Sequence, residues 1–73
     1  MQFVIWSFKH NAWWGPGNCG YTDALDMAGR YNAEEAGSIV VESVLLESVA
    51  ILLRIAEDKG PPKYHPYKGG ASQ

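Results

Sequence analysis

The chain has 73 residues, of which 47% are hydrophobic and 12% aromatic, and its formal net charge is −2. A chain of this length forms one domain, and this composition is that of a folded protein and excludes a disordered one. Residues 1–59 hold eight acidic residues against four basic ones, which argues against direct binding to the phosphate backbone of nucleic acids. We predict a single domain over 1–59, followed by a Pro/Gly-rich tail over 60–73.

Cysteine content and hydropathy indicate the compartment. Cys19 is the only cysteine, so an internal disulfide is excluded and a reducing cytoplasm is expected. The apolar N-terminal run is short and has no basic leader, so we expect no signal peptide. The most apolar window, 39–56, contains Glu42, Glu47 and Arg54, and such charges cost about 2.5–3.5 kcal/mol each near the centre of a membrane helix. We therefore predict a cytoplasmic protein without a membrane-spanning segment.

The N-terminal residues predict a β-hairpin. Residues 2–8 are rich in β-branched and aromatic side chains, and 12–14 form a second short apolar run. Asn11 suits a left-handed position in the turn between them. Pro16 cannot donate to a strand ladder, so the second strand is expected to end by Trp14.

A glycine-rich loop follows, over 15–23. Gly15, Gly17 and Gly20 have the G-x-G-x-x-G spacing of a dinucleotide-binding loop. Such a loop must lead directly into a helix whose free amides hold the phosphates, whereas the next clear helix begins a dozen residues later. We therefore interpret the spacing as consecutive turns. Residues 24–27 are compatible with a single helical turn, and 28–31 with a short third strand.

A long helix is predicted next. Asn32 and Glu35 have capping-box spacing, and no proline occurs from there to Asp58. Gly60 and the prolines after it are expected to end the helix. The predicted fold class is α+β: a small antiparallel sheet that covers one face of a single helix over 33–58, with an extended C-terminal tail.

The predicted helix has more apolar surface than a small sheet can cover. A second row, spaced in the a/d manner of a coiled coil, would face away from the sheet; this helix seam consists of Ile39, Leu46, Val49 and Leu53. We predict a homodimer joined through it. The alternatives are a different protein partner on the seam, or the aromatic tail folded back over it.

Aromatic residues are the candidate binding residues. Adjacent strand residues point to opposite faces, so one of Trp13 and Trp14 is expected to pack on the helix. The other is either covered by the loop or contacts a partner. The predicted partner-binding surface comprises Trp13, Trp14, Tyr21, Asp23, Arg30 and Tyr31. For Arg30, the alternative is a surface ion pair with Asp23 or Asp26.

No catalytic, metal-binding or cofactor-binding constellation is predicted. Cys19 with His10 or His65 as a base lacks the spacing of a known nucleophile pair, and adding Asp23 gives no zinc-site spacing. We expect a protein that is not an enzyme.

The segment AWWGPGNCGYTDALDMAGRYNAEEAG, within residues 3–37, resembles small proteins encoded by bacteriophages and prophages. By size and acidity such proteins are similar to inhibitors of host defence, including anti-CRISPR proteins. The resemblance implies a phage accessory protein that binds and inhibits a host protein complex, most simply a bacterial defence system. The alternative function is a sponge for a small nucleotide signal, held by the Gly-rich loop and nearby aromatic rings.

Overall fold

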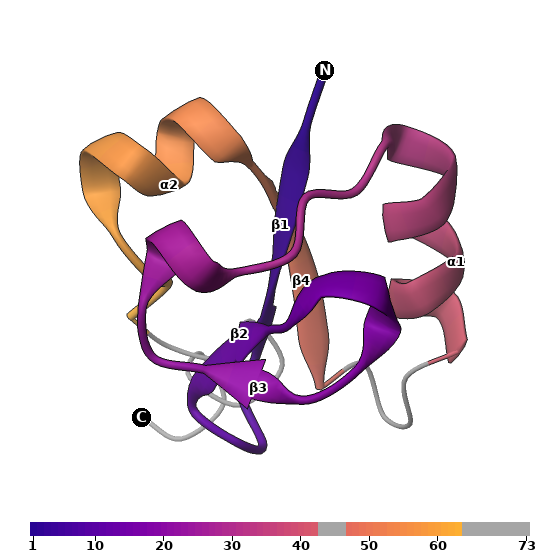
Figure 1. Ribbon diagram of the computed structural model, residues 1–73, viewed down its shortest axis with the longest axis horizontal. Coiled ribbons are helices and arrows are strands. Elements are labelled where there is room, and N and C mark those ends of the chain that lie inside the picture. The colour runs from indigo at the N-terminus through magenta and orange to yellow at the C-terminus, as the bar shows by residue number, and fades with distance from the viewer. Residues whose placement is uncertain (43–46, 64–73) are drawn as a thin grey trace, which may run out of the picture.

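The computed structural model describes residues 1–42 and 47–63, which form an antiparallel sheet with helices (Figure 1). The elements in chain order are β1 (Phe3–Ser7), β2 (Ala12–Trp14), the 3-10 turn η1 (Pro16–Asn18), β3 (Tyr21–Thr22), the 3-10 turn η2 (Leu25–Met27), α1 (Ala33–Glu42), β4 (Ser48–Leu52) and α2 (Leu53–Lys59). The predicted α+β class is confirmed.

The sheet has the order β3-β2-β1-β4 with antiparallel neighbours. The hairpin is confirmed, because Trp6 of β1 pairs with Trp13 of β2 and Asn11 has a φ of 55°. The third strand, however, is β3 and not the expected 28–31. Within 28–31, Tyr31 makes only an isolated bridge to Phe3.

The prediction of one helix over 33–58 is wrong. Its start is correct: the Asn32 amide donates to Glu35 Oε1 at 2.9 Å, and the Glu35 amide donates to Asn32 Oδ1 at 2.8 Å. Its end is also correct, because Gly60, with a φ of 76°, caps α2. Between the two ends, α1 covers Ala33–Glu42 and β4 pairs with β1 along its whole length. The uncharged sequence SVAIL forms a strand because β1 offers it a hydrogen-bonding edge and apolar neighbours.

The helix seam consequently does not form. Ile39 is 8% exposed on α1 and packs against the sheet, while Val49 on β4 and Leu53 on α2 pack against the opposite face. Leu46 lies outside the described residues. The described members of the predicted seam occupy three different elements, so they do not form one continuous surface on a helix.

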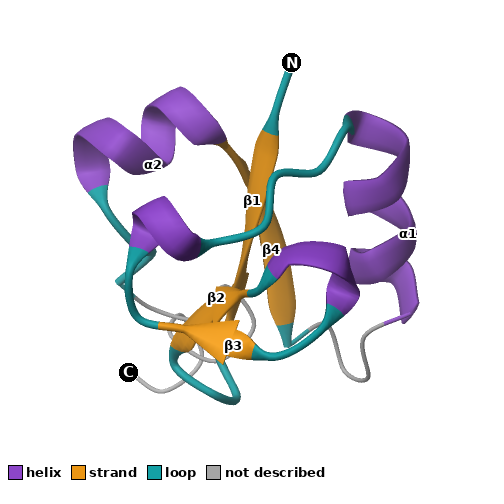
Figure 2. Ribbon diagram, viewed as in Figure 1, coloured by secondary structure: helices purple, strands orange, loops and turns teal. Residues whose placement is uncertain are grey.

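Helices lie on both sides of the sheet, not on one (Figure 2). β1 has side chains buried on both faces, since strand residues alternate. The face toward α2 and η2 holds Val4, Trp6, Trp13, Ala28 and Ala56. The face toward α1 holds Ile5, Tyr31, Ala36 and Ile39. The sheet is thus the middle of three thin layers. Across residues 1–42 and 47–63, no helix combines the length and apolar character needed to span a bilayer.

Candidate functional site

The Gly-rich loop is shaped by close backbone packing. A side chain on Gly15 would collide with the carbonyl oxygen of Cys19, and Gly17 and Gly20 have φ values of 67° and 75°, which favour glycine. The Gly15 amide donates to the Gly20 carbonyl at 2.8 Å. The three glycines of the G-x-G-x-x-G spacing therefore all have local structural reasons to be present.

Tyr31 attaches this loop to the rest of the molecule. Its hydroxyl donates to the Gly15 carbonyl and accepts from the Asn18 amide at 3.0 Å. The side chain is 6% exposed and belongs to the core on the α1 side. Its predicted place on an exposed partner-binding surface is wrong, because both the ring and the hydroxyl are used inside the domain.

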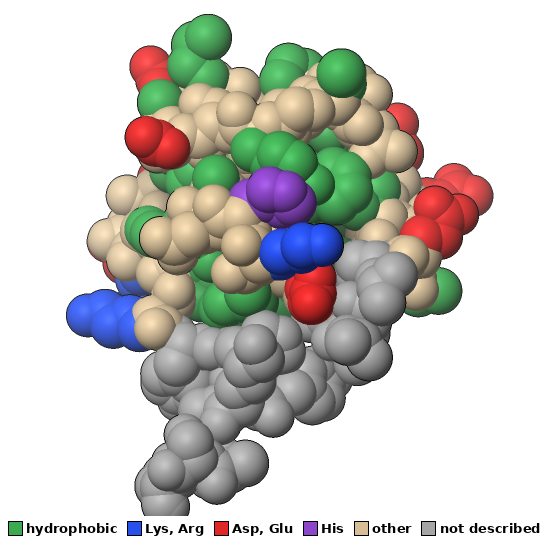
Figure 3. Space-filling model, turned by 90° about the horizontal axis from the view of Figure 1, so that it is seen from below, with side chains coloured by type: hydrophobic (Ala, Val, Ile, Leu, Met, Phe, Trp, Pro, Cys, Tyr) green, Lys and Arg blue, Asp and Glu red, His purple; other side chains and the backbone are tan. Residues whose placement is uncertain are grey.

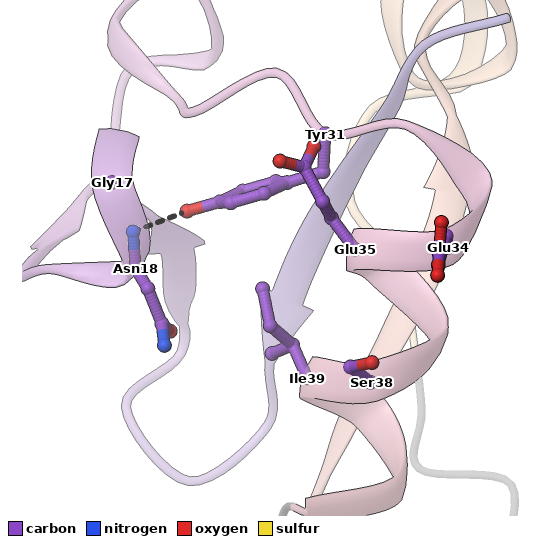
Figure 4. Close-up of a pocket in the computed structure, with 7 residues that line it drawn as sticks. All are labelled: Gly17, Asn18, Tyr31, Glu34, Glu35, Ser38 and Ile39. Carbon is purple, nitrogen blue, oxygen red and sulfur yellow. Dashed lines mark hydrogen bonds between the residues drawn. The ribbon is translucent and has the colours of Figure 1, made fainter.

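A pocket of about 420 Å³ lies between η1 and α1, and we call it the Tyr31 pocket. Its lining residues are Gly17, Asn18, Tyr31, Glu34, Glu35, Ser38 and Ile39. Figure 4 shows the Tyr31 ring reaching from the start of α1 to the loop, with the glutamates on the helix beside it. A phosphate in this pocket would meet two carboxylates, and the lining residues that the structure describes include neither lysine nor arginine. Phosphate sites instead combine free amides with cations.

The adjacent tryptophans point to opposite faces, as predicted. Trp13 is 2% exposed, and its ring meets Trp6 edge-on at 4.9 Å between centroids. It cannot contribute to an exposed surface, so its placement among the partner-binding residues is also wrong. Trp14 is partly buried on the α1 side, and its Nε1 donates to Ser48 Oγ at 3.2 Å. This hydrogen bond connects β2 to β4 across β1 and fixes the indole.

Trp14 and Tyr21 do come together, at one end of the sheet. Tyr21 is 45% exposed; its ring meets Trp14 edge-on at 5.7 Å and stacks on His10 at 3.9 Å, with 15° between the ring planes. These rings border a hollow of about 260 Å³, which we call the His10 groove. Its lining residues are Ser7, Lys9, His10, Trp14, Tyr21, Glu42, Glu47 and Ser48. In Figure 3 the histidine side chain lies beside hydrophobic side chains, with basic and acidic side chains nearby.

Ser7 and His10 have the spacing of a nucleophile and a base but not the exposure. Ser7 Oγ lies 3.2 Å from His10 Nδ1 and also accepts from the His10 amide at 3.1 Å. Ser7 is only 2% exposed. The hydroxyl closes the turn between β1 and β2, and Ser7 presents only a small part of its surface to the groove. The pair supports the position of His10 over Tyr21.

Sequence reasoning did not select His10 for this role. Its stacking partner Tyr21 lies across the sheet, on the strand beyond β2, so the pairing depends on β3. The sequence does contain a local signal for the turn. A serine side chain in a turn commonly accepts a hydrogen bond from a backbone amide a few residues later, as Ser7 does from His10.

Asp23 and Arg30 are exposed and are not among the residues that line the His10 groove. An Arg30 guanidinium nitrogen, Nη1, donates to the carbonyls of Leu25 at 3.1 Å and Ala28 at 2.9 Å. Arg30 thus braces η2. The guanidinium of Arg30 thus bonds to these backbone carbonyls, in place of the surface ion pair with Asp23 or Asp26 that was the alternative.

The remaining nucleophile and metal candidates are separated. Cys19 is exposed in the loop after η1, and His65 lies outside the described residues. In the part of the chain that the structure describes, no three His, Cys, Asp or Glu side chains gather as a metal site would require.

Comparisons with protein-family models, curated proteins and solved structures found no match. The resemblance to phage-encoded proteins therefore stays a prediction from the residues of 3–37.

Proposed function

We propose that this chain is a non-enzymatic binding protein whose His10 groove docks on a larger protein. The observation that carries the proposal is the ordered cluster of three rings at this groove. His10 stacks on Tyr21, and Tyr21 meets Trp14, whose indole is anchored to Ser48. Aromatic side chains held in one conformation lose little entropy on binding, which makes them effective interface anchors.

The border of the groove adds charge of both signs. Lys9 lies among its lining residues together with Glu42 and Glu47. An aromatic centre with a polar, charged rim is the usual anatomy of a transient protein interface. The Ser7 hydroxyl is engaged in closing the turn, and the residue is 2% exposed, which favours binding over catalysis at this groove.

The resemblance of 3–37 to phage-encoded proteins supplies the partner class. We propose a bacterial host complex, with defence systems of the CRISPR kind as the first to test, inhibited by occupation of its surface in the cytoplasm. The acidic balance of 1–59 favours a basic surface on that partner, since opposite charge accelerates encounter.

The second candidate function is sequestration of a small nucleotide. Its support is the Tyr31 pocket, which lies beside the Gly-rich loop and has a volume that suits a small molecule. Glu34 and Glu35 at this pocket would repel phosphates, so we rank it second.

The test is quantitative affinity purification from a phage-infected bacterial host with three tagged chains: the wild type, Tyr21→Ala and Met27→Ala. Met27 is the matched control, because it is a 64% exposed hydrophobic residue on η2, outside the His10 groove. We expect the wild type and Met27→Ala to capture the same host protein, and Tyr21→Ala to lose it while its circular dichroism is unchanged.

Direct calorimetry with the purified partner then measures affinity. A loss of at least about tenfold for Tyr21→Ala corresponds to 1.4 kcal/mol and is the size expected of an anchor residue. Undiminished binding by this variant contradicts the groove as the contact surface. Recovery of a nucleotide without a protein, with heat of binding for cyclic nucleotides, favours the second candidate.

A further inference from the structure

β4 forms one edge of the sheet, and its other side pairs with no strand in residues 1–42 and 47–63. Its sequence, Ser48–Leu52, contains no charged residue, proline or glycine. Those are the residues with which natural proteins commonly block pairing at exposed strand edges. Ala50, at the centre of β4, is exposed.

The hydrogen bonds to β1 determine which backbone groups face outward. The Leu53 amide donates to the Gln2 carbonyl, and the Phe8 amide donates to the Glu47 carbonyl. Backbone hydrogen-bonding groups point alternately toward and away from the neighbouring strand along an antiparallel ladder. The backbone groups that point toward β1 are therefore those of the odd-numbered residues in 47–53. The amide and carbonyl groups of Ser48 and Ala50 and the amide of Leu52 therefore face away from it, while the Leu52 carbonyl, at the N-cap of α2, accepts the first bond of that helix. The bridge between Phe3 and Tyr31 agrees, since Phe3 directs its own groups away from its partner Leu52.

Only part of this edge is open. Ser48 is 3% exposed, which closes the end of the strand near the His10 groove. Ala50 is exposed and Leu52 is partly exposed. The outward groups available for pairing are thus the amide and carbonyl of Ala50 and the amide of Leu52, two residues away.

We propose that two copies of this chain pair through the open edge of β4, in antiparallel orientation about a two-fold axis at Ile51. This register places Ala50 of each copy opposite Leu52 of the other. In each pair the Leu52 amide of one copy donates to the Ala50 carbonyl of the other, and the two-fold axis produces this bond twice. The small side chain of Ala50 lets the larger Leu52 side chain approach on the same face.

Charge complementarity favours a second copy of this chain as the partner at the open edge of β4. Glu47 precedes β4 and Arg54 follows it, on α2. In the antiparallel register, Glu47 of one copy comes beside the start of α2 in the other, where Arg54 is exposed. The two-fold axis produces this attraction twice. This interface replaces the helix seam and goes beyond the proposed function, because it uses neither Tyr21 nor His10.

The test is the mass of the full chain, measured by light scattering after gel filtration over a series of concentrations. We expect a dimer for the wild type that dissociates on dilution. Ala50→Pro places the proline ring on the open edge, where it blocks the approach of a second strand, and should give a folded monomer, because proline is tolerated on an edge strand with its amide side outward. Val49→Pro is the matched comparison: it removes a bond to β1 and should lower the melting temperature markedly.

Ala50→Lys is a second disrupting variant, since an exposed lysine is a common block on strand edges. Met27→Lys, at a 64% exposed position on η2, is the control and should leave the mass unchanged. Arg54→Glu should weaken the dimer, and adding Glu47→Lys should restore it.

A monomer mass for the full wild-type chain at every concentration overturns the proposal. The proposal is overturned even if a chain shortened to residues 1–63 dimerises, because that result would mean that residues 64–73 cover the β4 edge in the full chain. A dimer that persists unchanged in both folded Ala50 variants overturns it as well. Capture of a host protein through Tyr21 is a separate result and bears only on the proposed function.

Discussion

Tyr31 and the glycines near it determine how the Gly-rich loop lies against α1. The Tyr31 hydroxyl bonds to the Gly15 carbonyl and the Asn18 amide. Gly29 completes the contact: its amide donates to the Trp14 carbonyl at 2.9 Å. A side-chain carbon on Gly29 would stand 2.6 Å from the Gly15 oxygen and 2.8 Å from the Tyr31 hydroxyl. Backbone is thus packed on backbone, and only the smallest residue fits.

Gly29→Ala is expected to destabilise the domain by about 1–3 kcal/mol, the usual cost of an extra carbon in a packed position. The atoms that it meets cannot rotate away, since the nearest belongs to the backbone. Gly37→Ala is the control, because a side chain there meets nothing within 4 Å. In α1 this change should stabilise by about 0.5–1 kcal/mol. Urea denaturation of both variants checks the pair, and equal midpoints would contradict the described packing.

At the scale of elements, the sequence was informative wherever the deciding contacts are local. The hairpin, the position of Asn11, the capping box at Asn32 and the cap at Gly60 depend on neighbours within a few residues. β4 does not: SVAIL sits in an apolar, proline-free run that suits a helix equally well. It forms a strand because its backbone hydrogen-bonds to the free edge of β1. This tertiary pairing outweighs the local propensity of the segment.

The candidate site divides in the same way. Trp14 and Tyr21 belong to the predicted partner-binding residues, and their rings do meet. Trp13 and Tyr31 belong to the same prediction but are buried, because the sheet has a core on each face. The uninterrupted apolar run of β1 was a signal for burial on both sides. His10 could not be assigned to the groove without the position of β3.

Asn32→Ala is expected to cost about 1 kcal/mol of stability, because it removes the side-chain acceptor of the Glu35 amide at the start of α1. Asn32→Ser keeps a side-chain oxygen that can accept from the Glu35 amide, so its stability should stay close to that of the wild type. Thermal unfolding followed by circular dichroism measures both. If Asn32→Ala and Asn32→Ser unfold at the same temperature, side-chain capping does not support α1.

At the scale of the whole molecule, β4 is the strand on which the arrangement of the other elements depends. With β4 in place, β1 becomes an inner strand, α1 and α2 fall on opposite faces, and each face acquires its own core. The same strand supplies Ser48 to anchor Trp14 at the His10 groove, and Ala50 and Leu52 to the open edge. The aromatic rings of the proposed partner surface, His10, Trp14 and Tyr21, lie outside the proposed dimer edge, whereas Glu47 belongs to the border of both.

Both proposals therefore depend on residues 48–52 forming a strand beside β1, and nuclear Overhauser spectroscopy of the full chain tests this most directly. Residue pairs without ladder bonds bring their α-protons close together in an antiparallel sheet. We predict α-proton cross-peaks between Ile5 and Ala50 and between Ser7 and Ser48, with slow amide exchange at Val49 and Ile51. Continuous helical chemical shifts from Ala33 to Asp58, with sequential amide cross-peaks through Ala50, would contradict the account.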